Sequence, residues 1–434
     1  MKISQYTFLI EQNDRYCLYN TVSNRLISVD KSFYKVLEKH KNSQTELSAD
    51  FLEKYKDFAK ELINGFFVTE NDADALLWIK NILWSRRNNR YVYNITIAPT
   101  MDCNFSCFYC FEKNRKGTMS PKVMDGIVNY INQQTDMKFL NLVWFGGEPL
   151  LAYPKMKQIV ERLEFSEDVS VSSLLITNGY YLTPEVVDNL EALRISRIQL
   201  SIDGIFEQYN EVKFMPKDKK CFDQVLNNLD YFSEKSNIPL VLRLNIGKRN
   251  KNQFFDVVDF FRNRYPNKSI SVVPAFLKPT KNNASNCKSN CFASKKEIID
   301  FNTFVYQKTK DLSFIYPPDN FLECAVRNHN TVVFAPDGTV YKCWEVIGEK
   351  EHAIGHIKKD GTVEISSPTV LTRHHFGADP MSNTTCQKCS IFPICVGGCP
   401  QRRIFKEFHG SKKNLCSNFK QSLIANLKQR IESL

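Results

Sequence analysis

The sequence predicts an α/β protein whose middle part is an open barrel of six strand–helix units, with a smaller module on each side of it. Three observations support this fold class. Strands and amphipathic helices alternate in the middle of the 434 residues, short strands and helices precede them, and cysteines gather towards the C-terminus. Strand–helix alternation implies parallel strands joined by right-handed crossovers.

Residues 1–85 are expected to form a winged-helix-like module of small strands and short helices. Strands are predicted at residues 6–10, 16–19, 25–29 and 66–69. Residues 31–39 carry apolar side chains at helical spacing. Ser48 is predicted to cap a second helix, whose shared apolar face is Leu52, Tyr55, Ala59, Leu62 and Ile63.

Residues 90–281 are expected to form the barrel. Strands are predicted at 92–98, 140–145, 172–176, 197–202, 240–246 and 270–276. The helices between them are predicted at 122–133, 157–163, 184–193, 222–232 and 253–261. Six units are too few for a closed eight-stranded barrel, so a partial (β/α)6 TIM-like barrel is expected, with its chemistry at the carboxyl ends of the strands.

Residues 282–434 are expected to form a third, cysteine-rich domain. A polar stretch at 278–286 reads as the loop that leads into it. Regular helical patterns are sparse in this domain until residues 417–434.

The composition favours a soluble, cytoplasmic metalloprotein. No apolar run is long enough to span a membrane and no signal-peptide core is present, so no membrane partner is expected. Fourteen cysteines in such a protein are better explained as metal or cluster ligands than as disulfides. The net charge of +11 comes from scattered residues, so we expect no nucleic-acid partner; solvated faces and an anionic peptide substrate account for the excess.

A cysteine triad directly follows the first barrel strand. Cys103, Cys107 and Cys110 have the spacing C-x-x-x-C-x-x-C, with Tyr109 just before the last cysteine. Three thiolates can hold three corners of a cubane iron–sulfur cluster and leave one iron open to a small molecule. A zinc site is less favoured, because zinc ligands usually come in close pairs.

Glycines and polar residues end the next three strands. Gly146, Gly147 and Glu148 follow the second strand, Asn178 follows the third, and Ser201 stands at the end of the fourth. Each motif alone is an ordinary turn signal. At consecutive strand ends, together they place polar groups around one ligand.

These motifs, in this order, resemble the radical S-adenosylmethionine (SAM) enzymes. The resemblance implies that the open iron binds the amino and carboxylate groups of SAM and delivers one electron to cleave it. It also implies that the segment Gly146–Gly147–Glu148 binds the SAM amino group, that Asn178 and Ser201 shape the ribose region, and that Tyr109 shields the cluster with its backbone near the adenine.

Two residues are candidates for binding the SAM carboxylate. Lys213 stands where related maturases often carry an arginine, and a lysine keeps the charge but loses the bidentate geometry. Arg243, on the fifth strand, could substitute for it, although a structural arginine is an equal reading. No catalytic acid–base pair stands out in the sequence.

The C-terminal cysteines form a second group: Cys324, Cys343, Cys386, Cys389, Cys395, Cys399 and Cys416. A pair of zinc sites is one reading. Their order also resembles the SPASM domain, which implies two auxiliary 4Fe–4S clusters and therefore three clusters in all.

By that resemblance, one auxiliary cluster is complete and the other is one ligand short. Cys386, Cys389, Cys395 and Cys416 would hold the first, and Cys324, Cys343 and Cys399 the second. Cys287 and Cys291 either loop back to complete the second cluster or are free thiols. If no ligand arrives, an open iron could bind a substrate thiolate.

The N-terminal module resembles the leader-recognition element of enzymes that mature ribosomally made peptides. Such a module captures an extended leader as an added β-strand; a structural cap or a dimerisation arm is the alternative. The resemblances predict a peptide maturase that forms a thioether or carbon–carbon crosslink in a precursor peptide, with an electron donor such as ferredoxin or flavodoxin. A sulfatase-maturing-like enzyme acting on a protein partner and a non-catalytic iron–sulfur electron carrier are the other readings.

Overall fold

The computed structural model describes the chain except residues 113–114, 216–217, 219, 280–290, 292–293 and 318–319. The chain divides into two compact units. The first contains Met1–Asn88, Lys295–Arg327 and Arg373–Leu434, and the second contains Asn89–Ser294 and Asn328–Thr372. The first change of unit, at Asn88–Asn89, lies beside the predicted boundary at residues 85–90. The segment predicted as a third domain, residues 282–434, is divided between the two units.

The second unit is built on a ten-stranded sheet in the order β11-β10-β9-β8-β7-β6-β12-β13-β14-β15. Its first six strands are β6 Val92–Thr100, β7 Phe139–Gly146, β8 Ser170–Thr177, β9 Arg197–Ile202, β10 Leu240–Ile246 and β11 Ile270–Phe276. Each is parallel to its neighbour. The predicted parallel α/β arrangement is confirmed.

Four short strands extend this sheet beyond β6. They are β12 Thr331–Phe334, β13 Thr339–Tyr341, β14 Gly355–Ile357 and β15 Val363–Ile365. The strand β12 is parallel to β6 and the others are antiparallel to their neighbours. These strands come from residues expected in the cysteine-rich domain and were not predicted.

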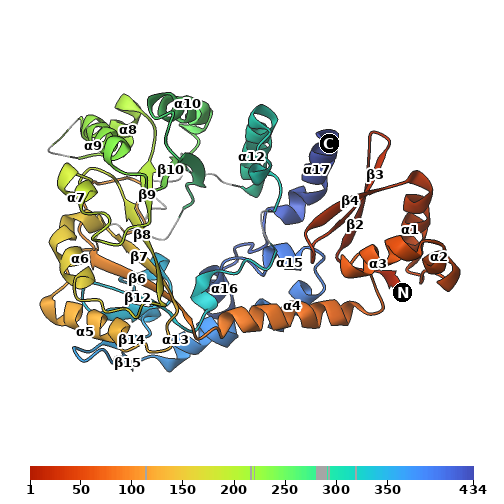
Figure 1. Cartoon of the computed structure of the whole chain (residues 1–434), viewed down its shortest axis with the longest axis horizontal. Coiled ribbons are helices and arrows are strands. Elements are labelled where there is room, and N and C mark those ends of the chain that lie inside the picture. The colour runs from red at the N-terminus through yellow and green to blue at the C-terminus, as the bar shows by residue number, and fades with distance from the viewer. Residues whose placement is uncertain (113–114, 216–217, 219, 280–290, 292–293, 318–319) are drawn as a thin grey trace. The chain divides into compact units, whose positions relative to one another are not determined.

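The two faces of the six parallel strands have different chemistry. Leu142, Leu175, Leu200 and Leu242 on one face are at most 2% exposed. Helices follow one another along one side of the sheet in Figure 1: α5 Pro121–Asn132, α6 Tyr153–Val160, α7 Pro184–Asp188, α8 Phe206–Val212, α9 Cys221–Lys235 and α10 Phe254–Arg264. The alternate residues face the other way and include the exposed polar side chains Asn141, Ser172, Arg197, Arg243 and Ser271.

The first unit contains an antiparallel sheet in the order β2-β3-β4. Its strands are β2 Thr7–Gln12, β3 Arg15–Asn20 and β4 Arg25–Val29, and the three predicted strands are confirmed. A two-stranded sheet, β1 Lys2–Ile3 with β5 Val68–Thr69, lies beside α1 Lys31–Ser43, α2 Ala49–Lys54 and α3 Lys56–Asn64. Leu18, Phe33, Leu37 and Leu62 are the centre of the core between them.

The single helix predicted after Ser48 is wrong. Ser48 does cap a helix, because its hydroxyl accepts a hydrogen bond from the Phe51 backbone N–H at 3.2 Å. That helix ends at Tyr55, where φ is −115° and ψ is 36°. The Tyr55 ring packs on Phe33 and Phe51, and Ile63 is 41% exposed rather than on a shared buried face. The predicted 66–69 strand is reduced to β5, because Phe66 has a φ of +59°.

The remaining helices of the first unit join the two ends of the chain. They are α4 Asp72–Arg87, α12 Lys295–Thr309, α14 Thr384–Gln387, α15 Phe392–Cys395, α16 Pro400–Phe408 and α17 Phe419–Glu432, while α13 Pro368–Thr372 ends the second unit. The strand residues Ile10, Cys17 and Tyr19 pack with Leu427 and Ile431 of α17. The predicted N-terminal module and the C-terminal segment therefore share a hydrophobic core.

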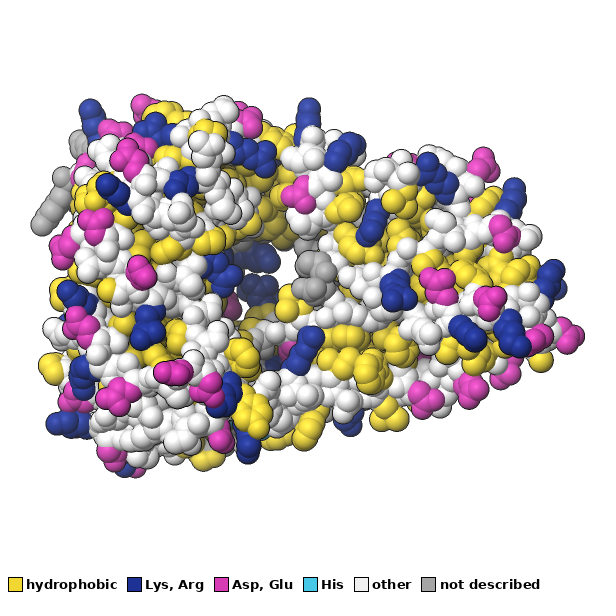
Figure 2. Space-filling view, viewed as in Figure 1, with side chains coloured by type: hydrophobic (Ala, Val, Ile, Leu, Met, Phe, Trp, Pro, Cys, Tyr) yellow, Lys and Arg dark blue, Asp and Glu magenta, His cyan; other side chains and the backbone are white. Residues whose placement is uncertain are grey.

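Figure 2 shows charges of both signs on one face of the molecule. On the face shown in Figure 2, lysine and arginine side chains are interspersed with aspartate and glutamate. Within the part of the chain that the structure describes, no helix combines the length and apolar character that crossing a membrane requires.

Candidate active site and cluster sites

The cysteine triad lies in the loop that follows β6. The backbone N–H of Cys110 donates to the Cys107 carbonyl at 3.2 Å, which folds the loop back on itself. Burial raises the pKa of the Cys103 and Cys107 thiols to about 12, and Cys107 adds to the shift at Cys103. The three cysteines belong to one short loop, and a cluster that takes thiolates would replace their protons.

Two glycines press the end of β7 against the start of this loop. Gly146 has a φ of +121°, and a Cβ there would lie 2.2 Å from the Thr100 carbonyl oxygen. A Cβ at Gly147 would lie 2.3 Å from the Asp102 carbonyl oxygen. Only glycine fits these positions without displacing backbone. The two glycines therefore set the position of the segment that leads into the triad.

The Glu148 carboxylate connects the ends of the second and third strands. It is fully buried and accepts hydrogen bonds from the Thr177 hydroxyl at 2.8 Å, the Asn178 N–H at 2.8 Å and the Leu150 N–H at 3.0 Å. Burial raises its pKa although these bonds favour the charged form. The Glu148 carboxylate already accepts three hydrogen bonds from this chain. A ligand would therefore contact the backbone next to Glu148 and not its side chain.

Asn178 contacts the triad loop. Its amide nitrogen donates to the Asn104 side-chain oxygen at 2.9 Å and lies 3.9 Å from the Cys103 sulfur. Its own side-chain oxygen accepts the Tyr180 N–H at 3.0 Å. The end of β8 is therefore held against the triad loop, as the sequence motifs at consecutive strand ends imply.

A buried polar network lies at the ends of β9 and β10. The Lys213 ammonium donates to the Ser201 hydroxyl at 2.6 Å and lies 3.4 Å from the Asp203 carboxylate. The Tyr109 hydroxyl donates to that carboxylate at 2.9 Å and accepts from the Asn245 amide at 3.1 Å. Burial alone would lower the pKa of Lys213, but Asp203 and the neighbouring thiols raise it overall. The sequence motif at the end of the fourth strand includes Asp203, but no role was predicted for it, and Asn245 was missed.

The second carboxylate oxygen of Asp203 has no partner in the part of the chain that the structure describes. Its Oδ1 is buried and makes no hydrogen bond within the described residues. Such orphaned acceptors are rare in folded proteins and mark places where a ligand or water completes the site.

Arg243 differs from Lys213, because no described residue is bonded to its guanidinium. It is exposed on β10, directly opposite Ser201 in the register of β9 and β10. Partial burial lowers its pKa, while Tyr109 and Asp203 act in the opposite direction. Among the described residues it makes no hydrogen bond or ion pair, so its guanidinium is available to an anionic ligand group.

Four of the C-terminal cysteines line one cavity of the first unit. Cys386, Cys389, Cys395 and Cys416 surround a volume of about 170 Å³. Burial raises the pKa of the Cys395 thiol, and the Cys389 and Cys416 thiols add to that shift. Four thiols around one small cavity are a donor set that fits a 4Fe–4S cluster.

The other C-terminal cysteines are only partly brought together. Cys324 and Cys399 both belong to the first unit, and the Cys399 thiol adds to the effect of burial in raising the pKa of Cys324. Cys343 belongs to the second unit. Cys291 is buried and disulfide-bonded, so the expectation that it is a cluster ligand or a free thiol is wrong. Cys287 lies outside the described residues.

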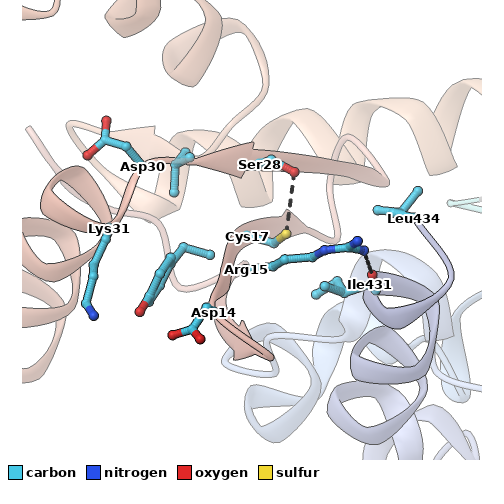
Figure 3. Close-up of a pocket in the computed structure, with 10 residues that line it drawn as sticks. Asp14, Arg15, Cys17, Ser28, Asp30, Lys31, Ile431 and Leu434 are labelled. Carbon is cyan, nitrogen blue, oxygen red and sulfur yellow. Dashed lines mark hydrogen bonds between the residues drawn. The ribbon is translucent and has the colours of Figure 1, made fainter.

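A larger pocket of about 600 Å³ lies between β3, β4 and the end of α17 (Figure 3). Arg15 on its wall donates to the Ile431 carbonyl at 2.5 Å, and the Cys17 sulfur lies 3.7 Å from the Ser28 hydroxyl. Asp14, Asp30 and Lys31 give its rim charges of both signs. Sequence reasoning did not find this pocket, because α17 is remote from the strands in sequence.

Comparisons with known proteins agree with the geometry. Residues 97–261 match the model of the radical SAM superfamily. The radical SAM cyclopropyl synthase TigE of Paramaledivibacter caminithermalis is 22% identical over 295 residues, which is 60% of each protein. The mycofactocin maturase MftC of Mycolicibacterium smegmatis is 23% identical over 72% of this chain and 79% of its own. The chain thus spans less than two thirds of TigE.

Two solved structures share the fold. The protein anSMEcpe with bound AdoMet superimposes with a TM-score of 0.60 at 17% identity, over 79% of this chain and 98% of its own. Streptococcus suis SuiB bound to S-adenosylmethionine gives 0.50 at 16% identity, over 92% and 95%. These two likenesses show the fold, and the family match covers residues 97–261; SAM and a 4Fe–4S cluster are the cofactors of the matched family.

Proposed function

We propose that this protein is a radical SAM peptide maturase that forms an intramolecular thioether or carbon–carbon crosslink in a ribosomally made precursor peptide. The observation that carries the proposal is the convergence of the Cys103/Cys107/Cys110 loop with the ends of three strands inside the radical SAM domain. When bound there, a reduced cluster supplies the electron that cleaves SAM to methionine and a 5′-deoxyadenosyl radical, which abstracts hydrogen from the peptide.

The residues around the triad have separate roles in this proposal. The three cysteines hold the cluster, and the backbone at Gly146 and Gly147 receives the SAM amino group. Arg243 binds the SAM carboxylate, because Lys213 is already bonded to Ser201 and Asp203. Lys213 instead holds the end of β9 in place, beside the ribose region.

The auxiliary cysteines are assigned to two further 4Fe–4S clusters. The 170 Å³ cavity with its four cysteines supports the first. The second would use Cys324, Cys343 and Cys399, and no other cysteine among the described residues is assigned to it, since Cys291 is disulfide-bonded. These clusters would take up or relay the electron that crosslinking leaves over.

The names of similar proteins support a peptide substrate. MftC is called a maturase, and a further structure of anSMEcpe, with a TM-score of 0.57, contains AdoMet and a peptide. The likeness of the fold to anSMEcpe also supports a second candidate, a sulfatase-maturing-like enzyme that modifies a protein partner.

The β4 strand supports leader capture by strand addition. It pairs only with β3, and no described residue bonds to the backbone of its outer edge. An edge of this kind is a template for an added strand. The pocket of Figure 3 lies on one face of β4 and would receive side chains of the leader that point to that face.

The proposal is tested by anaerobic reconstitution and co-expression. Reconstituted protein with dithionite and SAM is expected to release 5′-deoxyadenosine, and a variant with Cys103, Cys107 and Cys110 replaced by alanine is not. Co-expression with short open reading frames beside the gene, followed by tandem mass spectrometry, is expected to give a peptide lighter by two hydrogens, with fragmentation suppressed inside a loop.

Each outcome separates one reading from the others. Absence of 5′-deoxyadenosine would leave only an electron carrier. Release of 5′-deoxyadenosine with no change in any candidate peptide, but oxidation of a protein partner, would favour the sulfatase-maturing-like candidate.

A further inference from the structure

Arg403 is a buried cation aimed at the four-cysteine cavity. It lies on α16 and is 5% exposed. Its Nη2 donates to the Cys386 sulfur at 2.8 Å, and its Nε donates to the Gly397 carbonyl at 2.7 Å. The guanidinium is therefore held at a fixed angle against a sulfur of the proposed cluster.

The turn between Cys395 and Cys399 is shaped around this guanidinium. Val396, Gly397 and Gly398 all have positive φ, at 39°, 78° and 71°. A Cβ at Gly397 would lie 2.3 Å from the Pro380 Cβ and 2.9 Å from the Arg403 Nε, and one at Gly398 would lie 2.6 Å from the Leu415 carbonyl oxygen. The same turn thus makes room for Arg403 and lets the Leu415–Cys416 segment approach.

The side chains around Arg403 do not supply a counter-charge. It makes no ion pair among the described residues, whereas the buried Arg327 is paired with Glu323 at 2.8 Å. A buried cation without an anion is strongly unfavourable, and a neutral thiol is a weak acceptor. An anionic cluster with thiolate ligands would supply the missing negative charge.

We propose that Arg403 is a positioning residue that donates a hydrogen bond to the cluster ligand Cys386 and raises the one-electron reduction potential of the cluster held by Cys386, Cys389, Cys395 and Cys416. This rests on the auxiliary cluster of the proposed function. Reduction adds a negative charge to the cluster, and hydrogen bonds to the sulfurs and nearby cations stabilise that form. Lys406 and Lys420 also line the cavity, against the single acid Glu407, so the surroundings are basic overall.

The neighbouring Arg402 provides a matched control. It is half-buried on the same helix and makes no hydrogen bond to a cysteine sulfur among the described residues. Arg402→Gln removes the same charge one residue away, so a difference between the two variants reports the Arg403–Cys386 contact and not net charge.

The test is a redox titration of the full-length protein, followed by electron paramagnetic resonance. The background carries alanine at Cys103, Cys107, Cys110, Cys324 and Cys343, so that only the four-cysteine cluster remains. Arg403→Gln is expected to shift the oxidised-to-reduced equilibrium about tenfold towards the oxidised form, the effect of one charge-assisted hydrogen bond, which equals about 59 mV for one electron. Arg402→Gln is expected to shift it by less than a third of that.

The iron content of each variant shows whether its cluster is loaded, and the interpretation depends on that. Equal potentials for Arg403→Gln and Arg402→Gln, with full cluster loading, would overturn the proposal. If Arg403→Gln does not load, Arg403→Lys decides: a lowered potential supports the role of Arg403, and an unchanged one overturns it. If the background protein binds no cluster while the wild type still releases 5′-deoxyadenosine, the auxiliary assignment and this proposal fail and the radical SAM function stands.

Discussion

At the scale of single residues, the two cations near the triad are distinguished by their surroundings. Lys213 is buried and bonded to Ser201 and Asp203, whereas Arg243 is exposed without a partner in the described chain. A cation already bonded to a buried carboxylate has less to gain from a second anion. The surroundings of the two side chains therefore favour Arg243 as the ligand of the SAM carboxylate.

Replacement of Arg243 is expected to weaken SAM binding. Arg243→Gln should raise the Kd for SAM about tenfold or more, because a charge-assisted hydrogen bond contributes about 1.5–3 kcal/mol. Arg197→Gln is the control, because Arg197 is exposed on the same face but at the amino end of β9. Anaerobic equilibrium dialysis gives both values, and an unchanged Kd for Arg243→Gln would return the role to Lys213.

Gly147 provides a second prediction at this scale. Gly147→Ala should reduce the release of 5′-deoxyadenosine and lower the free energy of unfolding by about 1–3 kcal/mol, because the new Cβ overlaps the Asp102 carbonyl. Gly117→Ala is the control in the same loop region, where no atom lies within 4 Å of the added Cβ. Alanine at position 117 is strained only by its backbone φ of +118° and displaces no neighbouring atom. The Gly117→Ala variant should therefore bind as much iron at the triad as the wild type. Equal iron loss in both variants would contradict the steric argument.

At the scale of elements, strands were predicted most accurately where buried residues recur at regular spacing along the sequence. The predicted bounds of β9, β10 and β11 agree with the structure to the residue, because each strand alternates or is apolar and ends at a turn. The strands β12–β15 have three or four residues each and are defined by pairing partners that the local sequence does not reveal. The break between α2 and α3 depends on aromatic packing of Tyr55, and no helix-breaking residue marks it.

The outer edge of β4 gives a prediction that a pair of proline variants can test. Consecutive residues of an antiparallel edge strand direct their N–H groups alternately to the partner strand and outward. Of Ile27→Pro and Ser28→Pro, one should therefore lose leader binding at nearly unchanged Tm, and the other should lower Tm by removing a bond to β3. Fluorescence anisotropy with a labelled leader peptide and thermal denaturation distinguish them. If both proline variants are folded and bind the leader as tightly as the wild type, strand addition at β4 is excluded.

At the scale of the whole molecule, the order of the motifs predicts that the triad loop and the strand ends meet, but it does not predict how the C-terminal third is divided between two units. The triad and the strand-end motifs were predictable because the carboxyl ends of parallel strands meet at one edge of a sheet. Arg403 was not, because its contact with Cys386 depends on the left-handed turn at Val396–Gly398. The common unit of the two chain ends was also hidden, because it rests on packing between segments about 400 residues apart, such as Cys17 with Leu427.

The shared unit has a consequence for substrate handling. The β2–β4 sheet and the four-cysteine cavity belong to one compact unit, and the chain links that unit covalently to the unit that contains the cysteine triad. A leader held on β4 would raise the effective concentration of the attached core peptide at the radical SAM site. Such tethering increases apparent affinity by about 10²–10⁴-fold without any new contact to the core.

A core peptide separated from its leader should therefore be a poor substrate. Its kcat/KM is expected to fall by about 10²–10⁴-fold, and free leader added in trans should restore little of it, because the tether is what raises the local concentration. Mass spectrometry of the crosslinked product gives the rate, and the release of 5′-deoxyadenosine without peptide checks that the radical SAM site is intact. A fusion of the core to a scrambled leader should behave like the free core. Equal rates with and without the leader would show that the core alone is recognised, and the β4 edge would then need another role.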